Sequence, residues 1–554
     1  MDRAPASGAG NAGSIPAGRV DLMFSDTQLL YYRQKVPLRR FQIKSRPKRR
    51  GYETRKNIKI LTNRDQYLII NMLQRSFYRN DKSCALFLCK KDRMMIEGEE
   101  MADLNAPAGG NKMAVMPVPK LLLNMSFPLM LSLVFQSLYN IVDSIFVARI
   151  SESALTATSL AYPVQILMIA AATGTAAGVS ALLSRLVGSG RPKEASRGAV
   201  CGLLLAVLTS FIFIILGIFA SSWFVSLFTD DTQTALMCTQ YLKIVMIFCT
   251  GNFIEIMGQR LLQSVGKTVC SMISLICSAC TNIILDPILI FGLFGLPALG
   301  IRGAAIATVI GQWVGAAVVL LLNKYKNKDI SLKIKGFKFD KRMAAAIYKV
   351  GLPTMLTQAM GSIMNASMNA VLISFSSTAV AFFGVYFKLQ NFLFMPINGI
   401  GQAVLPIAGF NYGSKSKSRL KQLVKTALPA AAAVGLIGTA IFCAIPGPLL
   451  KMFSAGSDML SLGIPALRII SPTFALGAVT VVAGYFSSGL GNGINNMLGV
   501  ALRQVVILIP CVIIFARTLG IDHVWYAFWI SESIAFAVSV LLFSRTYKKR
   551  TANM

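Results

Sequence analysis

Long apolar runs recur along the chain from about Met113 to the C-terminus, and short polar segments separate them. Most runs are near or above the roughly 20 apolar residues that a helix needs to cross a bilayer. They predict an all-α polytopic membrane protein with twelve transmembrane helices. The predicted helices cover residues 121–148, 156–186, 199–227, 236–262, 268–294, 299–323, 345–375, 379–409, 421–446, 460–487, 493–517 and 524–547.

The last six predicted helices repeat the first six at a constant spacing of 225 residues. Pro128 aligns with Pro353, and Gly188 aligns with Gly413, and a basic loop follows each of these two glycines. Six is an even number, so both halves have the same orientation in the membrane. Parallel repeats of this kind predict a binding site between the halves, near the bilayer midplane.

Residues 1–112 differ from the rest, because they are rich in charge and contain no apolar run long enough to span a membrane. The run Gly13–Ala17 is what the T-loop of a transfer-RNA gene yields when it is translated. We expect a basic disordered tail, or an upstream reading frame joined through a misplaced start site; an arm for nucleic acid or anionic lipid is the functional alternative. The expected divisions are this extension (1–112), an N-lobe (113–323), a cytoplasmic linker (324–344) and a C-lobe (345–554).

Composition agrees with the membrane assignment. Hydrophobic residues make up 54% of the chain, and only 14% are charged, against about 25% in soluble proteins. The net charge of +32 is concentrated in short clusters between apolar runs, which favours an anionic lipid surface over nucleic acid as the partner. The basic clusters place both ends of the membrane-embedded region 113–554 in the cytoplasm; they are residues 188–197, 324–342, 415–421 and 548–550.

The sequence lacks the signatures of an enzyme. His523 is the single histidine, so a catalytic triad or a histidine metal cluster is excluded. The pair Cys277 and Cys280 lies inside an apolar helix with no second pair, and we interpret both as ordinary small residues. We expect no catalysis and no cofactor other than a transported cation.

Two carboxylates and a carboxamide fall within predicted spans. A carboxylate at the membrane centre costs about 3 kcal/mol on insertion scales, so it needs a partner or a function. Asn282 and Asp286 are one helical turn apart and share a face, Pro287 can free a backbone carbonyl, and Asp143 lies in the first helix. These oxygens suit Na⁺; alternatively the two acids share a proton, or they only hold helices together.

Two further acids lie in apolar helices. Glu255 either pairs with Arg260 or Lys267 or contributes to coupling or to binding a cationic substrate. Glu532 has no evident partner, so we expect a surface or helix-contact position.

Candidate cavity residues form a polar face one turn before Asp143 and a methionine stripe in the seventh helix. Methionine adapts to varied ligands, although such a stripe also suits core packing, and the polar face could simply join helices. The candidates for lining a substrate cavity are Gln136, Tyr139, Asn140, Met364 and Met368, together with Glu255.

Several segments resemble the multidrug and toxic compound extrusion family. They are the first-helix run Leu138–Asp143, the fifth-helix run Ile283–Pro287, the sixth-helix run Gly303–Thr308 and the loop Gly188–Ala195. The resemblance covers essentially all of 113–554. It implies two six-helix lobes in a V-shaped antiporter that exports organic, often cationic, compounds in exchange for Na⁺ or H⁺ by alternating access.

The family's prokaryotic branch with an N-lobe cation site implies the role of each site residue. It also implies a monomer in the bacterial plasma (inner) membrane that acts on small molecules. Another branch has acids in the seventh and tenth helices, but 345–375 and 460–487 contain none, and Met368 is aligned with Asp143. The implied cation-coupling residues are Asp143, Asn282, Asp286 and Thr308, with Asp143 and Asp286 as Na⁺ ligands if sodium is used.

Two other functions compete with drug export. A lipid-linked saccharide flippase of the same superfamily would favour a cationic cavity, for which Lys388, Arg468 and Arg503 are too few and too scattered. A receptor or channel would leave the paired halves without an explanation.

Overall fold

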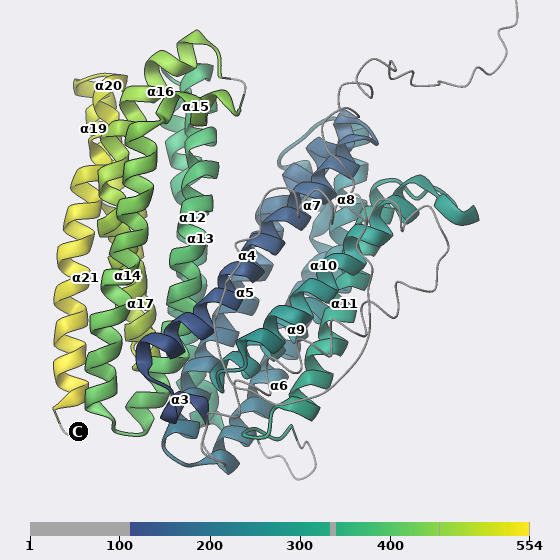
Figure 1. Ribbon diagram of the computed structural model, residues 1–554. Coiled ribbons are helices and arrows are strands. Elements are labelled where there is room, and N and C mark those ends of the chain that lie inside the picture. The colour runs from purple at the N-terminus through teal and green to yellow at the C-terminus, as the bar shows by residue number, and fades with distance from the viewer. Residues whose placement is uncertain (1–110, 333–338, 454, 553) are drawn as a thin grey trace, which may run out of the picture. The chain divides into compact units, whose positions relative to one another are not determined.

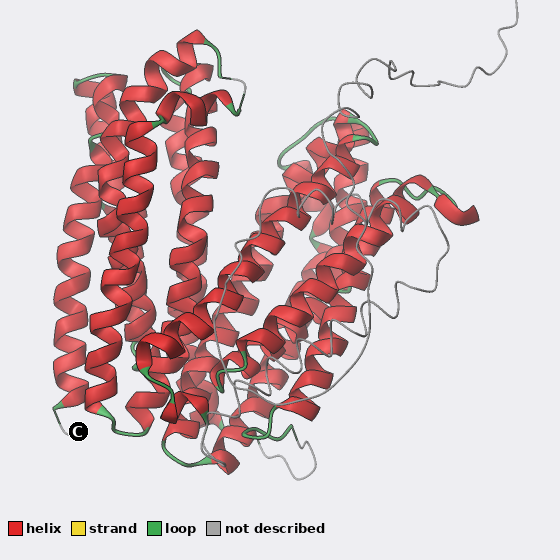
Figure 2. Ribbon diagram, viewed as in Figure 1, coloured by secondary structure: helices red, strands yellow, loops and turns green. Residues whose placement is uncertain are grey.

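The computed structural model describes residues 111–332, 339–453, 455–552 and 554 (Figure 1). The chain divides into two units, and the described residues all belong to the second, Ile96–Met554. Every regular element among them is helical (Figure 2). The interpretations of the N-terminal extension up to residue 110 lie outside the described residues.

The N-lobe contains six spans, preceded by the short helix α3 (Lys112–Val115). Its fourth span is broken, since α8 and α9 meet at an angle of 49°. The elements are α4 (Val118–Ala148), α5 (Glu152–Gly188), α6 (Pro192–Phe219) with α7 (Ser221–Ser226), α8 (Thr232–Ile247) with α9 (Thr250–Ser264), α10 (Thr268–Phe291) followed by η1 (Leu293–Gly295), and α11 (Ile301–Lys326).

The C-lobe repeats this order. Its fifth span contains a π-helical segment, η3 (Leu502–Val506). The elements are α12 (Lys341–Leu372), α13 (Ser377–Gly413), α14 (Lys417–Ala444) with α15 (Pro446–Lys451), α16 (Ser457–Ile470) with η2 (Ser471–Thr473) and α17 (Phe474–Gly489), α18 (Gly493–Ala501) with η3 and α19 (Leu508–Thr518), and α20 (Ile521–Val524) with α21 (Ala527–Thr551).

The 225-residue repeat is confirmed at the level of helix ends. The spacing relates both ends of α5 to those of α13, both ends of α6 to those of α14, and both ends of α7 to those of α15. Even the caps repeat, because Ser151 and Ser376 each accept a hydrogen bond from the backbone N–H three residues later, which satisfies a free donor of the first turn. We call two residues 225 positions apart counterparts.

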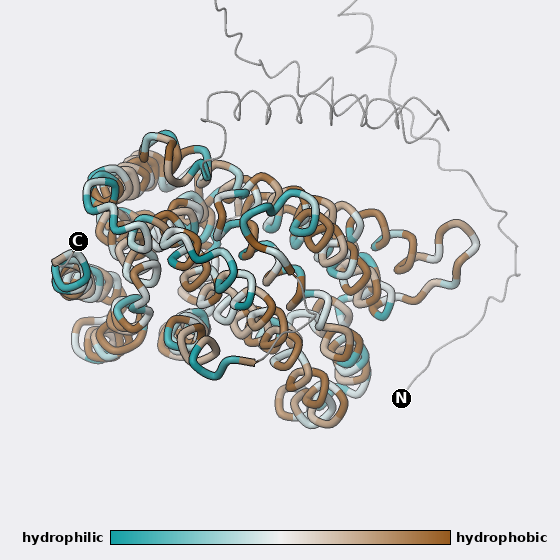
Figure 3. The backbone as a smooth tube through the Cα atoms, turned by 90° about the horizontal axis from the view of Figure 1, so that it is seen from below, coloured by the Kyte–Doolittle hydropathy of each residue, from teal (hydrophilic) through white to brown (hydrophobic). Residues whose placement is uncertain are grey.

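The prediction of twelve membrane-spanning helices in two lobes is also confirmed. Ten helices of the described part are long and apolar enough to cross a membrane, and the bent pair α8–α9 makes eleven. The remaining span is α12, which has 32 residues but includes polar side chains such as Gln358 and Asn365. Viewed end-on, the helices of the described part are mostly hydrophobic (Figure 3). Exposed residues such as Ile212 on α6 and its counterpart Ile437 on α14 suit contact with lipid.

The lobes exchange the beginnings of their first helices. Leu122 of α4 is buried in the apolar core of the C-lobe, whereas its counterpart Ile347 of α12 is buried in the core of the N-lobe. As a result α4 packs on α13 as well as on α10, and α12 packs on α5 as well as on α18. Each lobe is therefore completed by a segment of the other.

Two glycines bring α5 and α13 close together. A Cβ at Gly188 would collide with the carbonyl oxygen of Phe410, and a Cβ at Gly413 would collide with that of Arg185. Phe410 is the counterpart of Arg185, so the two contacts are related by the repeat. This close approach joins the lobes where the basic loops after Gly188 and Gly413 begin, at what we call the basic end.

Candidate functional site

A polar cluster lies inside the N-lobe, where α4, α10 and α11 pack together. Asn282 and Asp286 occupy one face of α10, and both are buried, with exposed fractions of 4% and 0%. The Asn282 amide donates to Asp286 Oδ1 over 3.2 Å and lies 3.4 Å from the Thr308 hydroxyl of α11. Their single-turn spacing on α10 accounts for this arrangement.

Asp143 completes the cluster from α4. Its carboxyl group interacts electrostatically with that of Asp286. The structure therefore places near one another the four residues for which the family resemblance implied cation coupling. Pro287 lies inside α10, which continues beyond it to Phe291.

Three buried oxygens of this cluster have no hydrogen-bond donor. They are Asp143 Oδ1, Asn282 Oδ1 and Asp286 Oδ2. A buried polar atom without a partner costs about 1–3 kcal/mol, and more when it is charged. Oxygens in this state suit a hard cation such as Na⁺, and a carboxyl pair equally suits a proton.

The donor set differs from that of a transition-metal centre. In the described part of the chain, no three His, Cys, Asp or Glu side chains are arranged to hold a metal ion. A cation held by Asp143 and Asp286 would share its remaining contacts with the neutral oxygens of Asn282 and Thr308.

Aromatic hydroxyls surround the carboxylates. Tyr139 interacts electrostatically with both Glu255 and Asp143, and Tyr241 of α8 interacts with Asp143 and Asp286. The Gln165 amide donates to the Tyr241 hydroxyl over 3.0 Å. Sequence reasoning missed Tyr241 and Gln165, because a single polar residue in an apolar helix gives no signal of its neighbours.

Glu255 lies nearby in the same lobe, only 6% exposed. It accepts a hydrogen bond from the Gln259 amide and another from the Ser278 hydroxyl, each over 3.2 Å. The alternative that pairs it with Arg260 or Lys267 is not observed among the described residues. Arg260 instead donates to Gln263 over 2.9 Å. Glu255 is thus a third N-lobe carboxylate, and both of its hydrogen-bond donors are neutral.

The other candidate cavity residues fall into two groups. Gln136 and Tyr139 on α4 are half-buried, and Asn140 is exposed. Met364 and Met368 are 5% and 1% exposed and lie in the apolar core of the C-lobe, where core packing accounts for them. Only the α4 residues Gln136, Tyr139 and Asn140 therefore remain candidates for lining a cavity.

The C-lobe contains a buried ion pair that the sequence did not reveal. Glu532 was expected at a surface or helix-contact position without a partner, but it is 5% exposed and its Oε1 lies 3.0 Å from Arg503 Nε. The Arg503 guanidinium also lies 5.2 Å from the centre of the Phe394 ring. Arg503 belongs to η3 and Glu532 to α21, 29 positions apart in sequence, so no local pattern could pair them. Arg503 is neutralised and offers no free charge to an anionic substrate.

These observations define a two-lobe helical membrane transporter. The MatE family model matches residues 128–288 and 353–514, one stretch in each lobe and together more than half of the chain. The chain belongs to the MatE family.

Curated relatives are similar over most of the chain. Multidrug export protein MepA of Staphylococcus aureus (strain bovine RF122 / ET3-1) is 25% identical over 433 residues, covering 77% of this chain and 93% of that protein. The protein of the same name from Staphylococcus haemolyticus (strain JCSC1435) is 24% identical over 429 residues, with the same coverage.

Solved structures share the fold. An outward-facing multidrug resistance MATE family transporter of the MOP superfamily superposes with a TM-score of 0.75 at 23% identity, covering 81% of this chain and all of that chain (100%). A MOP superfamily transporter from Pyrococcus furiosus, described as having a binding pocket of reverse polarity that suggests a different function, gives a TM-score of 0.75 at 22% identity, covering 80% and 99%. Since the same fold accommodates pockets of opposite polarity, the substrate has to be argued from the site.

Proposed function

We propose that this protein is a cation-coupled antiporter that exports organic compounds across the bacterial plasma membrane. The observation that carries the proposal is the N-lobe cluster of Asp143, Asn282, Asp286 and Thr308, in which three buried oxygens have no donor. The relatives named as multidrug export proteins support drugs or similar compounds as the substrates. Parallel repeats support a single binding region between the lobes that opens alternately to the two sides.

The coupling step follows from charge. When Asp143 and Asp286 are both ionised they repel each other and lack a positive partner, so the empty cluster favours uptake of a cation. Bound Na⁺ or H⁺ offsets one of the two negative charges and weakens the electrostatic attraction that would hold a cationic substrate. The cation and the substrate then compete, which is the thermodynamic basis of exchange.

The substrate contacts are proposed on the same lobe. Tyr139 connects the cluster to Glu255 electrostatically, and Gln136 and Asn140 extend the polar face of α4. A carboxylate with neutral neighbours attracts an organic cation, and an aromatic ring can bind it through its face. Glu255 is therefore proposed to select for positive charge in the substrate.

The proposed topology places the basic end in the cytoplasm. The loops after Gly188 and Gly413 and the tail Lys548–Arg550 are basic, as cytoplasmic loops usually are. We propose a monomer, because each lobe is completed within one chain by α4 or α12. Labelling of single cysteines at Lys549 and Asp230 from the outside of intact cells tests this orientation, and modification of the Lys549 site alone would contradict it.

The decisive experiment measures export of a cationic dye from proteoliposomes in which a Na⁺ gradient and a pH gradient are imposed separately. Export driven by either gradient is expected, and the effective gradient identifies the coupling ion. Asp143→Asn is expected to abolish gradient-driven export at normal expression, whereas Asp458→Asn, which removes an exposed acid of the C-lobe, leaves it unchanged. Equal export by Asp143→Asn and wild type would refute the proposal.

A further inference from the structure

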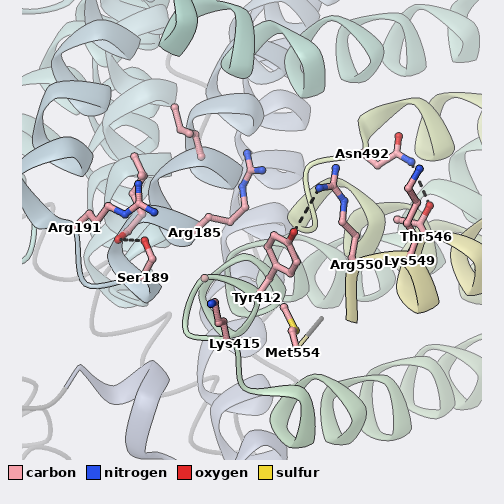
Figure 4. A pocket seen from close by; sticks show the side chains of 13 residues that line it. Arg185, Ser189, Arg191, Tyr412, Lys415, Asn492, Thr546, Lys549, Arg550 and Met554 are labelled. Carbon is pink, nitrogen blue, oxygen red and sulfur yellow. Dashed lines mark hydrogen bonds between the residues drawn. The ribbon is translucent and has the colours of Figure 1, made fainter. Parts of the chain in front are cut away.

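A pocket rich in positive charge lies at the basic end, where the two lobes meet. Its volume is about 890 Å³, within the range of about 300–1,000 Å³ typical of small-molecule sites. Figure 4 shows its lining, to which α5 and the following loop contribute from the N-lobe, and α13, α21 and the loop residues Lys415 and Asn492 contribute from the C-lobe. The cationic side chains of the lining are Arg185, Arg191, Lys415, Lys549 and Arg550.

Most of this charge is uncompensated. Among the described residues, only Arg191 has an acidic partner, Glu194, at 3.6 Å. Arg185 and Arg550 are close enough to interact as like charges. Bringing like charges together is unfavourable unless an anion or solvent separates them, so the pocket favours an anionic ligand.

The two arginines are held in place by neutral groups. Arg185 Nε donates to the Ala181 carbonyl over 2.8 Å, and its guanidinium packs beside Gly491, where a Cβ would collide with it. Arg550 Nη1 lies 3.4 Å from the Tyr412 hydroxyl, and the Tyr412 ring lies 5.9 Å from its guanidinium carbon. Among the described residues, no second hydrogen-bond acceptor contacts either guanidinium group.

The positive-inside tendency of cytoplasmic loops does not account for this arrangement. That tendency concerns charges in loops near the membrane surface, and Lys415 and Lys549 fit it because they are exposed. Arg185 is different, because it lies inside helix α5, half-buried, and reaches the C-lobe at Gly491. A half-buried arginine at the junction between the lobes therefore favours a ligand that binds at that junction.

We propose that this pocket binds a ligand that carries two or more phosphate groups. Arginine presents a planar fork of N–H donors that matches phosphate oxygens, and several uncompensated cations favour a multivalent anion over a single carboxylate. Basic pockets between membrane helices at the cytoplasmic surface bind anionic lipid headgroups by the same chemistry. The source is a diphosphate lipid of the surrounding leaflet or a soluble polyphosphate.

Such a ligand would contact both lobes. Arg185 belongs to the N-lobe, and Lys549 and Arg550 belong to the C-lobe, so a bound polyanion bridges them beside the close approach of Gly188 and Gly413. Any ligand that binds only the joined arrangement stabilises it by mass action. The expected signature is a rise in thermal stability that grows with the logarithm of ligand concentration.

The test uses the full chain in detergent free of phospholipid and follows the apparent Tm against three probes. Cardiolipin carries two phosphates, phosphatidylglycerol carries one, and inorganic tripolyphosphate is soluble. Cardiolipin or tripolyphosphate is expected to raise the Tm more than phosphatidylglycerol at equal total phosphate. A response to cardiolipin alone identifies a lipid source, and a response to tripolyphosphate alone identifies a soluble one.

Variants separate a built site from general attraction. Arg185→Gln with Arg550→Gln is expected to weaken apparent binding about tenfold or more, in line with the loss of charge-assisted hydrogen bonds. Lys421→Gln removes an exposed charge from α14, outside the pocket lining, and is the matched control. If the arginine variant does not fold, Lys415→Gln with Lys549→Gln removes two exposed cations of the same pocket.

The proposal is overturned if no probe raises the Tm, or if Lys421→Gln weakens the response as much as the pocket variants do. Asp143→Asn is expected to bind the probe like wild type. This control separates the pocket from the proposed coupling site, so the two proposals can fail independently.

Discussion

The two lobes share one helical framework but bury charge in opposite ways. In the N-lobe, Asp286 and Glu255 are buried without a positively charged partner among the described residues, and Asp286 keeps an oxygen without a donor. In the C-lobe, Glu532 is equally buried but lies 3.0 Å from Arg503. On the proposed mechanism the N-lobe takes up a cation from outside the protein, whereas the C-lobe pairs its acid with Arg503.

Residues at counterpart positions show which side chains distinguish the buried charges of the two lobes. Ser278, which donates to Glu255, has Arg503 as its counterpart, and Glu255 has Thr480 as its counterpart. In the N-lobe the acid occupies one position and a neutral donor faces it. In the C-lobe the donor's position carries Arg503, and its acidic partner Glu532 lies on another helix, α21. Repeated helices thus preserve geometry while the buried chemistry diverges.

The largest expected effect comes from exchanging the site residues between lobes. Asp286→Cys gives the N-lobe cluster the side chain found at the C-lobe counterpart, Cys511, and removes a carboxylate. Coupled export should therefore be lost. The reverse exchange, Cys511→Asp, should not create a second coupling site, because the counterparts of Asp143 and Asn282 are Met368 and Ile507, whose side chains carry no oxygen. Proteoliposome dye export measures both, and export that survives in Asp286→Cys would remove the functional contrast between the lobes.

Next in size is the cost of separating the C-lobe ion pair. Glu532→Gln leaves the Arg503 charge buried without a partner, which typically costs about 3–5 kcal/mol. Glu255→Gln should cost much less, since the neutral amide still accepts a hydrogen bond and strands no opposite charge. Denaturation in detergent compares the two variants.

The double variant Arg503→Met with Glu532→Leu is the control for this comparison. It removes both charges and should recover much of the stability lost in Glu532→Gln. Similar destabilisation by Glu255→Gln and Glu532→Gln would contradict the view that only the C-lobe neutralises its own acid.

A smaller and symmetric effect is expected at the close approach of α5 and α13. Gly188→Ala and Gly413→Ala each push a methyl group into a backbone carbonyl of the other lobe, and such overpacking costs about 1–3 kcal/mol. Gly384→Ala, also on α13, meets nothing within 4 Å and is the control. Thermal unfolding should give nearly equal losses for the first two, and a loss in only one would show that the junction is not symmetric.

The smallest effect concerns the helix caps at α8 and α16. Asp231 caps α8 by accepting hydrogen bonds from the Thr234 side chain and from backbone N–H groups, and the Thr234 hydroxyl holds the pKa of Asp231 below its usual range. Its counterpart Gly456 precedes α16 without a side-chain cap. Asp231→Ala should lower the Tm slightly, and Gly456→Asp should raise it slightly.

The pH dependence follows from the lowered pKa. The stabilisation by ionised Asp231 is fully present above the ordinary value of about 3.9 and is lost as pH falls through the lower folded value. The Tm difference between wild type and Asp231→Ala should therefore shrink at acidic pH. A difference that stays constant down to pH values below the folded pKa would rule out this electrostatic origin.

Local patterns were sufficient for the spans and the repeat. Apolar runs located all twelve spans, with most ends within about four residues of those observed. The 225-residue spacing also relates Gly266 to Gly491, whose φ angles are 86° and 85°. α12, predicted at 345–375, is not among the helices apolar enough to cross a membrane by composition alone, but it repeats α4 at the 225-residue spacing. Asn282 and Asp286 were grouped correctly, because their neighbourhood is set by one helical turn.

The sequence by itself therefore determined the features that depend on spacing along the chain. These are the helices, their 225-residue repetition and the shared face of Asn282 and Asp286 on α10. Tertiary structure decided which helices face one another. It buried Leu122 of α4 in the C-lobe core, brought Ser278 and Gln259 within hydrogen-bonding distance of Glu255, and paired Glu532 with Arg503. The physical reason is that a membrane helix is apolar nearly all round, so its periodicity does not show which side meets a neighbour, and only packing brings distant polar groups together.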